Sequence, residues 1–286
     1  MAESSKRRRH LAVLGALVAS MAAPGVAHAV PPDNDSFATP RDLAGEFGLV
    51  RASTVDASKE AGEPDHAGVL GNKSVWFRWT APNPRRVMFR TGVPEGVAFD
   101  SLLGVYRGAT VDALTVVASN DDASPGDWSS KVAFQPESGA TYLVAVDGVA
   151  GKSGQVSLSW AMRPSNNDFG AAQPITGTSG SIRSDTSLAT REAGEARWHR
   201  RSVWYRWTAP RTGDVVFRTG GSLFDTVLGA YSGGSLGSAK LLASNDDSFD
   251  GSSRVRLPVR QGRTYRIVVA GFGGDSGPAV LRWRLS

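Results

Sequence analysis

The stretch Ser-Val-Trp-Phe-Arg-Trp-Thr-Ala-Pro at residues 74–82 decides the fold, because it returns as Ser-Val-Trp-Tyr-Arg-Trp-Thr-Ala-Pro at residues 202–210. A second stretch, Ala-Ser-Asn-Asp-Asp at residues 118–122, returns at residues 243–247. The chain therefore contains two copies of one module, and each copy serves as a control for the other. A residue present in both copies is a property of the module, whereas a residue present in one copy is the better candidate for a specialised role.

The repeated stretch predicts a β-strand with one face in the core. Successive side chains of a strand point to opposite faces, so Val75, Phe77 and Trp79 share a face and are expected to be buried. Trp76 and its counterpart Trp204 lie on the other face, which also carries an arginine. An indole there could stack on a sugar, but we expect packing under a loop because both copies keep it.

Both copies predict an all-β fold, namely two tandem antiparallel jelly-roll-type β-sandwiches. Short runs rich in β-branched and aromatic residues alternate with Gly, Pro, Asn, Asp and Ser, and long helical periodicity is missing. Trp160 and Trp283 correspond between the copies and are expected to close each core from the last strand. In the first copy, strands are expected near residues 43–50, 75–80, 86–91, 101–107, 114–118, 131–135, 141–147 and 155–160.

Residues 1–29 resemble an export signal, with a basic start, an apolar segment and an Ala27-His28-Ala29 cleavage site. The sequence thus predicts a secreted, extracellular protein that is not integral to a membrane, exported by the general or the twin-arginine route. The mature chain is expected to form one sandwich over residues 30–162 and another over 163–286. It has no cysteine, so burial alone, or burial assisted by a metal, must stabilise each core.

Charge is distributed unequally between the copies. Residues 30–162 hold 11 basic and 16 acidic residues, whereas residues 163–286 hold 17 basic and 10 acidic residues. The nearly balanced total removes the main argument for a nucleic-acid partner. The opposite signs indicate that the halves attract each other, that the second copy meets an anionic partner, or that the surface drifted without a role. The sequence makes no prediction of oligomeric state.

A repeated acidic pattern predicts calcium as a cofactor. Phe-Asp-Ser/Thr precedes Asn-Asp-Asp in both copies, and a pair of glutamates also recurs. Calcium takes six to eight oxygen ligands, which loops at one end of a sandwich could gather. The alternative is that Asn and Asp shape turns through hydrogen bonds to nearby backbone. The candidate ligands are Glu60, Glu63, Asp100, Asn120, Asp121 and Asp122, with Glu192, Glu195, Asp225, Asn245, Asp246 and Asp247 in the second copy.

Two tryptophans without a counterpart are candidates for ligand contact. Trp128 follows Pro-Gly-Asp in a predicted loop, and exposed aromatic side chains on loops tend to mark contact surfaces. Trp198 aligns with His66 of the first copy and is surrounded by arginines, which together could grip an acidic polymer. Ordinary loop packing is an equal alternative for both. The predicted contacts of this kind are Trp128, Trp198, Arg197, Arg200 and Arg201.

These residues carry a family resemblance. Residues 60–68 (Glu-Ala-Gly-Glu-Pro-Asp-His-Ala-Gly), residues 74–82, Phe99-Asp100-Ser101, residues 120–122 and residues 141–148 resemble the bacterial pre-peptidase C-terminal domain. The resemblance covers nearly all of both copies. It implies a secreted, non-catalytic β-sandwich that is appended to exported hydrolases or surface proteins, acts in attachment, targeting or secretion, and sometimes binds calcium. The second copy departs from the pattern at residues 196–200 and at Ala270, which replaces Asp147.

The repeat also argues against most enzymes. Only His66 and His199 follow the export signal, and in the sequence they do not align with each other, which disfavours a serine-protease triad. A three-histidine zinc site is excluded by count, and no phosphate-binding glycine motif occurs. We therefore predict a secreted binding or targeting protein that engages an extracellular polymer or cell-surface component, by adhesion or carbohydrate binding. The alternatives are a glycan hydrolase with a carboxylate pair and a structural envelope component.

Overall fold

The first copy of the module folds into nine strands, in a computed structural model that describes residues 30–92, 100–248 and 250–286. The predicted export signal lies outside the described residues. The strands are β1 (Arg41–Leu43), β2 (Phe47–Ser53), β3 (Val75–Thr80), β4 (Val87–Gly92), β5 (Ser101–Arg107), β6 (Thr115–Asn120), β7 (Lys131–Phe134), β8 (Thr141–Gly148) and β9 (Gln155–Met162). Each strand predicted from the sequence has a counterpart among them.

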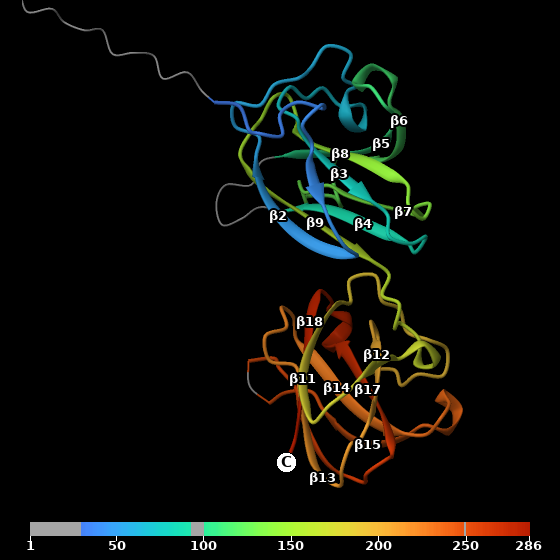
Figure 1. The fold of residues 1–286 in the computed structure, drawn as a ribbon. Coiled ribbons are helices and arrows are strands. Elements are labelled where there is room, and N and C mark those ends of the chain that lie inside the picture. Colours follow the sequence, from blue (N-terminus) through green and yellow to red (C-terminus); the bar gives the residue numbers. More distant parts are fainter. Residues whose placement is uncertain (1–29, 93–99, 249) are drawn as a thin grey trace, which may run out of the picture. The chain divides into compact units, whose positions relative to one another are not determined.

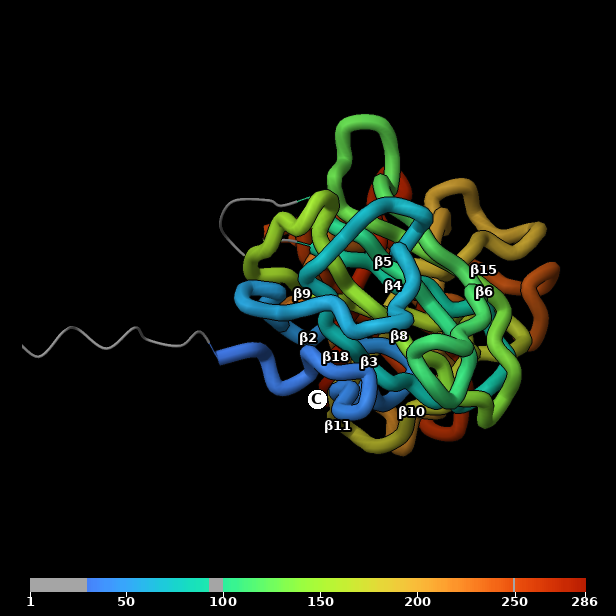
Figure 2. Tube along the Cα trace, turned by 90° about the horizontal axis from the view of Figure 1, so that it is seen from above, coloured from blue at the N-terminus to red at the C-terminus, as the bar shows by residue number. Residues whose placement is uncertain are grey.

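These strands form a sandwich with jelly-roll topology. One sheet has the order β1-β3-β8-β5-β6 and the other the order β2-β9-β4-β7. From β2 to β9 the chain changes sheet at every step except the β5–β6 hairpin, which is how a jelly roll interleaves its strands. Strands β3 and β8 are neighbours in both views of the chain (Figures 1 and 2). The prediction of an all-β sandwich is confirmed.

The second copy repeats this topology strand for strand. Its sheets have the orders β10-β12-β17-β14-β15 and β11-β18-β13-β16. The strands are β10 (Gln173–Ile175), β11 (Ser179–Asp185), β12 (Val203–Thr208), β13 (Gly213–Arg218), β14 (Thr226–Ser232), β15 (Lys240–Asn245), β16 (Arg254–Val259), β17 (Thr264–Gly271) and β18 (Pro278–Leu285). No strand in the described part of the chain crosses the predicted junction between residues 162 and 163.

The start of each module differs from the prediction. The expected strand at residues 43–50 is two strands in different sheets, and β1 pairs with β3 in parallel, as β10 does with β12. Gly45, at a φ of 87°, turns the chain between the sheets. Its carbonyl accepts hydrogen bonds from Nε1 of Trp79 at 3.1 Å and of Trp160 at 3.3 Å, which fixes the crossing point. The sandwiches are therefore antiparallel apart from these first pairings.

The repeated tryptophans lie where the alternation places them. Trp79 and Trp207 are fully buried in the main cores, and Trp160 and Trp283 close those cores from β9 and β18. Trp76 and Trp204 are also fully buried, although they lie on the outer face of the five-stranded sheet. The expectation that both pack rather than contact a ligand is confirmed.

Each sandwich thus has a second, smaller core outside its five-stranded sheet. In the first sandwich this core holds Trp76, Tyr106, Leu143 and Ala145, covered by Phe37. In the second it holds Phe169, Ala172, Trp204, Tyr231 and Val268, with Trp198 against it. The loops that cover these small cores carry the four candidate glutamates, Trp198 and the candidate arginines. Among the described residues we find no helix of the length and apolarity needed to cross a membrane.

Candidate functional sites

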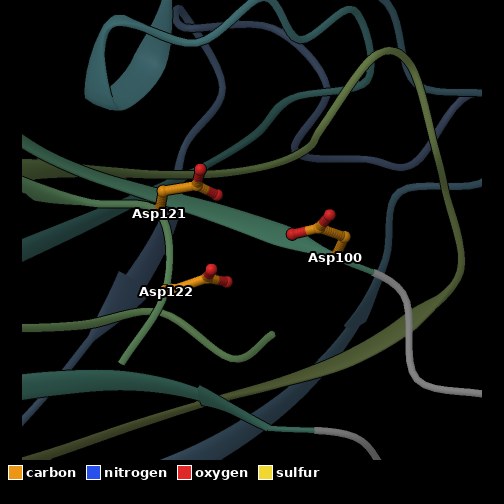
Figure 3. Close-up of side chains that lie close together, drawn as sticks. All are labelled: Asp100, Asp121 and Asp122. Carbon is orange, nitrogen blue, oxygen red and sulfur yellow. The ribbon is translucent and has the colours of Figure 1, made fainter. Parts of the chain in front are cut away.

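Three aspartates of the first sandwich meet at one end of the β5–β6 hairpin. Asp100 directly precedes β5, and Asp121 and Asp122 directly follow β6, so the antiparallel pairing brings the three together. One carboxylate oxygen of each residue lies within 4.8 Å of those of the other two. Figure 3 shows Asp121 and Asp122 pointing toward Asp100 across a common space. The structure therefore brings these three of the predicted ligands together.

The electrostatics of this cluster suit a cation. Burial, followed by the charges of Asp122 and Asp100, raises the pKa of the Asp121 carboxyl. Its Oδ1 atom is buried and has no hydrogen-bond partner among the described residues. The only described ion pair in the cluster joins Asp100 to Lys152 at 3.3 Å. Carboxylate oxygens are the donors that Ca²⁺ prefers, so the residues present fit this ion.

The corresponding aspartates of the second sandwich lie close enough for their charges to interact, but among the described residues only Asp100, Asp121 and Asp122 gather their oxygens within 4.8 Å of one another. Burial, followed by the charges of Asp247, Asp246 and Asp275, raises the pKa of the Asp225 carboxyl. The Oδ1 atoms of Asp225 and Asp246 are both buried without a partner in the described parts of the chain. Asp275 takes the place that Lys152 has in the first sandwich, since both follow the hydrogen-bonded start of the last hairpin. The second cluster thus gains a fourth carboxylate and loses the lysine.

The other predicted metal ligands have structural partners. Oδ1 of Asn120 accepts a hydrogen bond from the Lys131 backbone at 2.8 Å, and Oδ1 of Asn245 accepts one from the Arg254 backbone at 2.7 Å. These two asparagines shape the turn, which is the alternative the sequence left open.

The four glutamates lie elsewhere in each sandwich. Glu60 and Glu192 accept the backbone N–H groups of Phe37 and Phe169 and so anchor the loop over the small core. Glu63 contacts His66, and Glu195 accepts hydrogen bonds from Ser202 and Trp204. None of the four joins the described aspartate cluster of the first sandwich.

His66 and His199 occupy equivalent positions, so the prediction that they do not align was wrong. His66 contacts the Tyr106 hydroxyl at 2.7 Å and packs against Trp76. His199 contacts the Tyr231 hydroxyl at 3.1 Å and packs against Trp204. The second copy has one extra residue between its glutamate and its histidine, which shifts Trp198 into register with His66 in the sequence alone. The histidines are parts of the small cores.

His66 contacts a glutamate and His199 does not, and this difference makes the stability of the second sandwich depend on pH. Burial, followed by the charge of Arg191, lowers the pKa of His199 from 6.5 to about 4. The Tyr231 hydroxyl is hydrogen-bonded to Nε2 of His199, and Glu195 accepts a hydrogen bond from Trp204 instead of contacting the histidine. Nδ1 of His199 has no hydrogen-bond partner among the described residues. The unfolded chain therefore binds a proton between pH 6.5 and 4 that the folded sandwich does not.

We expect the second sandwich to keep its full stability above pH 6.5 and to lose about 3 kcal/mol as the pH falls from 6.5 to 4. Urea denaturation at a series of pH values measures this loss. A His199→Gln variant is the control, because it should remove the loss over that interval. An unchanged pH profile in that variant would assign the loss to other groups.

Four arginines surround a hollow on the second sandwich. Arg191, Arg197, Arg200 and Arg201 line a space of about 730 Å³ together with Gly273 and Gly274. Arg200 donates a hydrogen bond to the Gly273 carbonyl at 3.1 Å, and Arg201 donates one to the Ser187 carbonyl. Three of these arginines were predicted ligand contacts. The structure adds Arg191, which the sequence analysis missed because it lies apart from the other three in the chain. We call this feature the arginine hollow.

The two candidate tryptophans have different surroundings. Trp128 is 56% exposed. Trp198 is half-buried, and its ring lies 3.8 Å from that of His199, centroid to centroid. Trp198 therefore packs on the small core beside the arginine hollow, whereas Trp128 is free to contact a partner.

Comparisons with known proteins add information on fold. No family model matches the chain, and no curated protein matches it. A solved pre-peptidase C-terminal domain of a collagenase from Bacillus anthracis is similar at 9% identity, covering 40% of this chain and 94% of that one, with a TM-score of 0.29.

Two other solved structures are also similar. A periplasmic inhibitor of g-type lysozyme from Aeromonas hydrophila has 15% identity, covers 40% of this chain and 97% of that one, and has a TM-score of 0.28. A tandem CBM22 domain of Xyn10C from Paenibacillus barcinonensis has 10% identity, covers 85% of this chain and 92% of that one, and has a TM-score of 0.21. Likeness at this level carries no ligand or activity over to the chain.

Proposed function

We propose that this chain is an exported, non-catalytic binding protein whose second sandwich holds an anionic extracellular polymer in the arginine hollow. Calcium at the aspartate clusters braces the loops at the end of each sandwich. The first sandwich, with Trp128 exposed, adds contact surface to the same partner. The observation that carries the proposal is the convergence of four guanidinium groups on one hollow that no carboxylate lines.

The charges of the arginine hollow favour an anion over a neutral ligand. None of the four arginines takes part in an ion pair among the described residues, and like charges at close range repel each other. Guanidinium groups bind carboxylate, sulfate or phosphate groups through paired hydrogen bonds. The hydrogen bonds of Arg200 and Arg201 to loop carbonyls hold their side chains in place beforehand, which lowers the entropy lost on binding.

The geometry favours a binding protein over the alternative of a glycan hydrolase. Such an enzyme needs two carboxylates facing each other across an open groove, about 5–10 Å apart. Three hollows are lined by described residues of the second sandwich. Two of them have no carboxylate side chain in their lining, and the third has only that of Asp214. In the first sandwich the carboxylates of Asp100, Asp121 and Asp122 gather at one point, which suits a bound cation better than a scissile bond.

Binding to dextran sulfate, with uncharged dextran of the same length as the reference, tests the proposal. The mature chain should bind the sulfated polymer with an affinity that falls as the salt concentration rises, and it should not bind the neutral polymer. Replacing Arg197 and Arg200 by alanine should weaken binding by about tenfold or more. The control removes the same charge at Arg260 and Arg263, two exposed arginines on the β16–β17 turn, and should have little effect.

Equal losses in the two double variants would contradict a specific site and indicate a diffuse charge effect. Release of shortened chains from either polymer, or from a panel of cell-wall glycans, would favour the hydrolase instead.

A further inference from the structure

A pair of arginines on the outer face of the second sandwich has no counterpart in the first. Arg206 of β12 stands directly opposite Arg266 of β17, and Pro174 of β10 is its partner on the other side. At the same positions the first sandwich has Arg78 opposite Leu143, with Asp42 on the other side. The strand register therefore gives a residue-by-residue comparison between the copies.

In the first sandwich the single arginine is neutralised. Nε of Arg78 lies 2.6 Å from one oxygen of Asp42, and Nη2 lies 3.1 Å from the other. Leu143 belongs to the small core beneath Phe37. The second sandwich has lost the aspartate and has gained a second positive charge at the leucine position.

In the second sandwich the two guanidinium groups remain without a counter-ion. Neither the Arg206 nor the Arg266 side chain forms an ion pair or a hydrogen bond within the described residues. Burial, followed by the charge of Arg206, lowers the pKa of Arg266. The Arg266 guanidinium lies 4.8 Å from the centre of the Phe169 ring, and its Nη1 atom is buried with no acceptor in the part of the chain that the structure describes. Like charges placed directly opposite on a sheet destabilise it, and an unpaired buried donor adds to the cost.

Both arginines line a hollow whose size and polar lining suit a small anion. They line a space of about 870 Å³ with Thr208, Thr264, Gly177 and Pro174, and no carboxylate lines it. The hydroxyls of Thr208 and Thr264 are hydrogen-bonded to each other at 2.8 Å, which leaves one hydroxyl hydrogen to donate to a ligand. Two facing cations without a described counter-ion, beside an open space that two hydroxyl groups also line, form a site suited to an anion.

We propose that this hollow, which we call the paired-arginine site, binds a doubly charged tetrahedral oxyanion, the group present in sulfate and phosphate esters. Two guanidinium groups on adjacent strands match the two charges of such a group and can each donate to its oxygens. The site is separate from the arginine hollow and does not depend on the proposed function. On a sulfated or phosphorylated polymer, the two sites would take successive anionic groups.

Titration of the mature chain with sodium sulfate and with sodium phosphate tests the site, with sodium chloride at the same ionic strength as the reference. Calorimetric binding and the shift in melting temperature are the readouts. Either oxyanion, or both, should bind and raise the melting temperature beyond the chloride reference, and the two arms identify which source of the oxyanion is preferred.

Two variants restore the first sandwich's residues and should therefore fold. Arg266→Leu removes one cation, and Pro174→Asp supplies a carboxylate to pair with Arg206. Each should weaken oxyanion binding by about tenfold or more, while the Arg197 and Arg200 double variant should retain it. Circular dichroism and the melting temperature in chloride check the fold of each variant.

Sulfate and phosphate effects equal to that of chloride would overturn the proposal. Undiminished binding in a folded Arg266→Leu variant would also overturn it. Loss of dextran sulfate binding in the Arg197 and Arg200 variant bears only on the arginine hollow, so failure of one site is distinguishable from failure of the other.

Discussion

Replacing Trp79 by alanine is expected to lower the free energy of unfolding of the first sandwich by about 3–5 kcal/mol. Trp79 is fully buried, packs edge-on against Phe89 at 5.4 Å and donates a hydrogen bond to the Gly45 carbonyl. The substitution leaves a cavity and removes a partner from the carbonyl that fixes the crossing between the sheets. Urea denaturation of the mature chain, followed by fluorescence and circular dichroism, measures the loss.

The Trp128→Ala variant is the matched control, because it removes the same side chain from an exposed loop. Its free energy of unfolding should change by no more than about 0.5 kcal/mol. The equivalent change in the second sandwich, Trp207→Ala, should behave like Trp79→Ala, because Trp207 is fully buried and bonded to the Gly177 carbonyl. A large loss at Trp128, or a small one at Trp79, would contradict the assignment of the shared tryptophans to the core and of Trp128 to the surface.

Calcium is expected to raise the melting temperature of the mature chain, and a chelator should reverse the effect. A ligand that binds only the folded state at a hundred times its dissociation constant stabilises it by about 2.7 kcal/mol per site. The two clusters differ in charge, since Lys152 contacts Asp100 in the first and Asp275 stands in its place in the second. The second sandwich should therefore bind calcium more tightly. Calorimetric titration with CaCl₂ after exhaustive chelation measures both sites.

The variants Asp121→Asn and Asp246→Asn separate metal binding from ordinary turn formation. Each removes one of the crowded negative charges, so each should raise the melting temperature without calcium and lose the calcium-dependent rise in its own sandwich. Lys152→Ala should strengthen binding in the first sandwich, since it removes a competing cation. A metal-free chain with an unchanged melting temperature in calcium and in chelator would refute the calcium sites and leave the aspartates as turn residues.

The sequence determined the fold class, because the evidence for it is local. Period-two alternation in a repeated stretch identified Trp79 and Trp207 as core residues, and regularly spaced turn residues delimited the strands. The sequence is also enough to place Asp100 near Asp121 and Asp122, because a hairpin places the start of one strand beside the end of the next.

The tertiary structure decided everything that depends on register and on approach between distant segments. Asp275 joins Asp225 through the last hairpin, and Arg191 joins the arginine hollow from a separate loop. A single extra residue hid the equivalence of His66 and His199. Arg206 and Arg266 are distant in the sequence and meet only because β12 and β17 pair in one particular register. Alternation tells which face a side chain takes, whereas pairing between strands decides which side chains stand opposite each other, and that pairing is set by the packing of the whole sandwich.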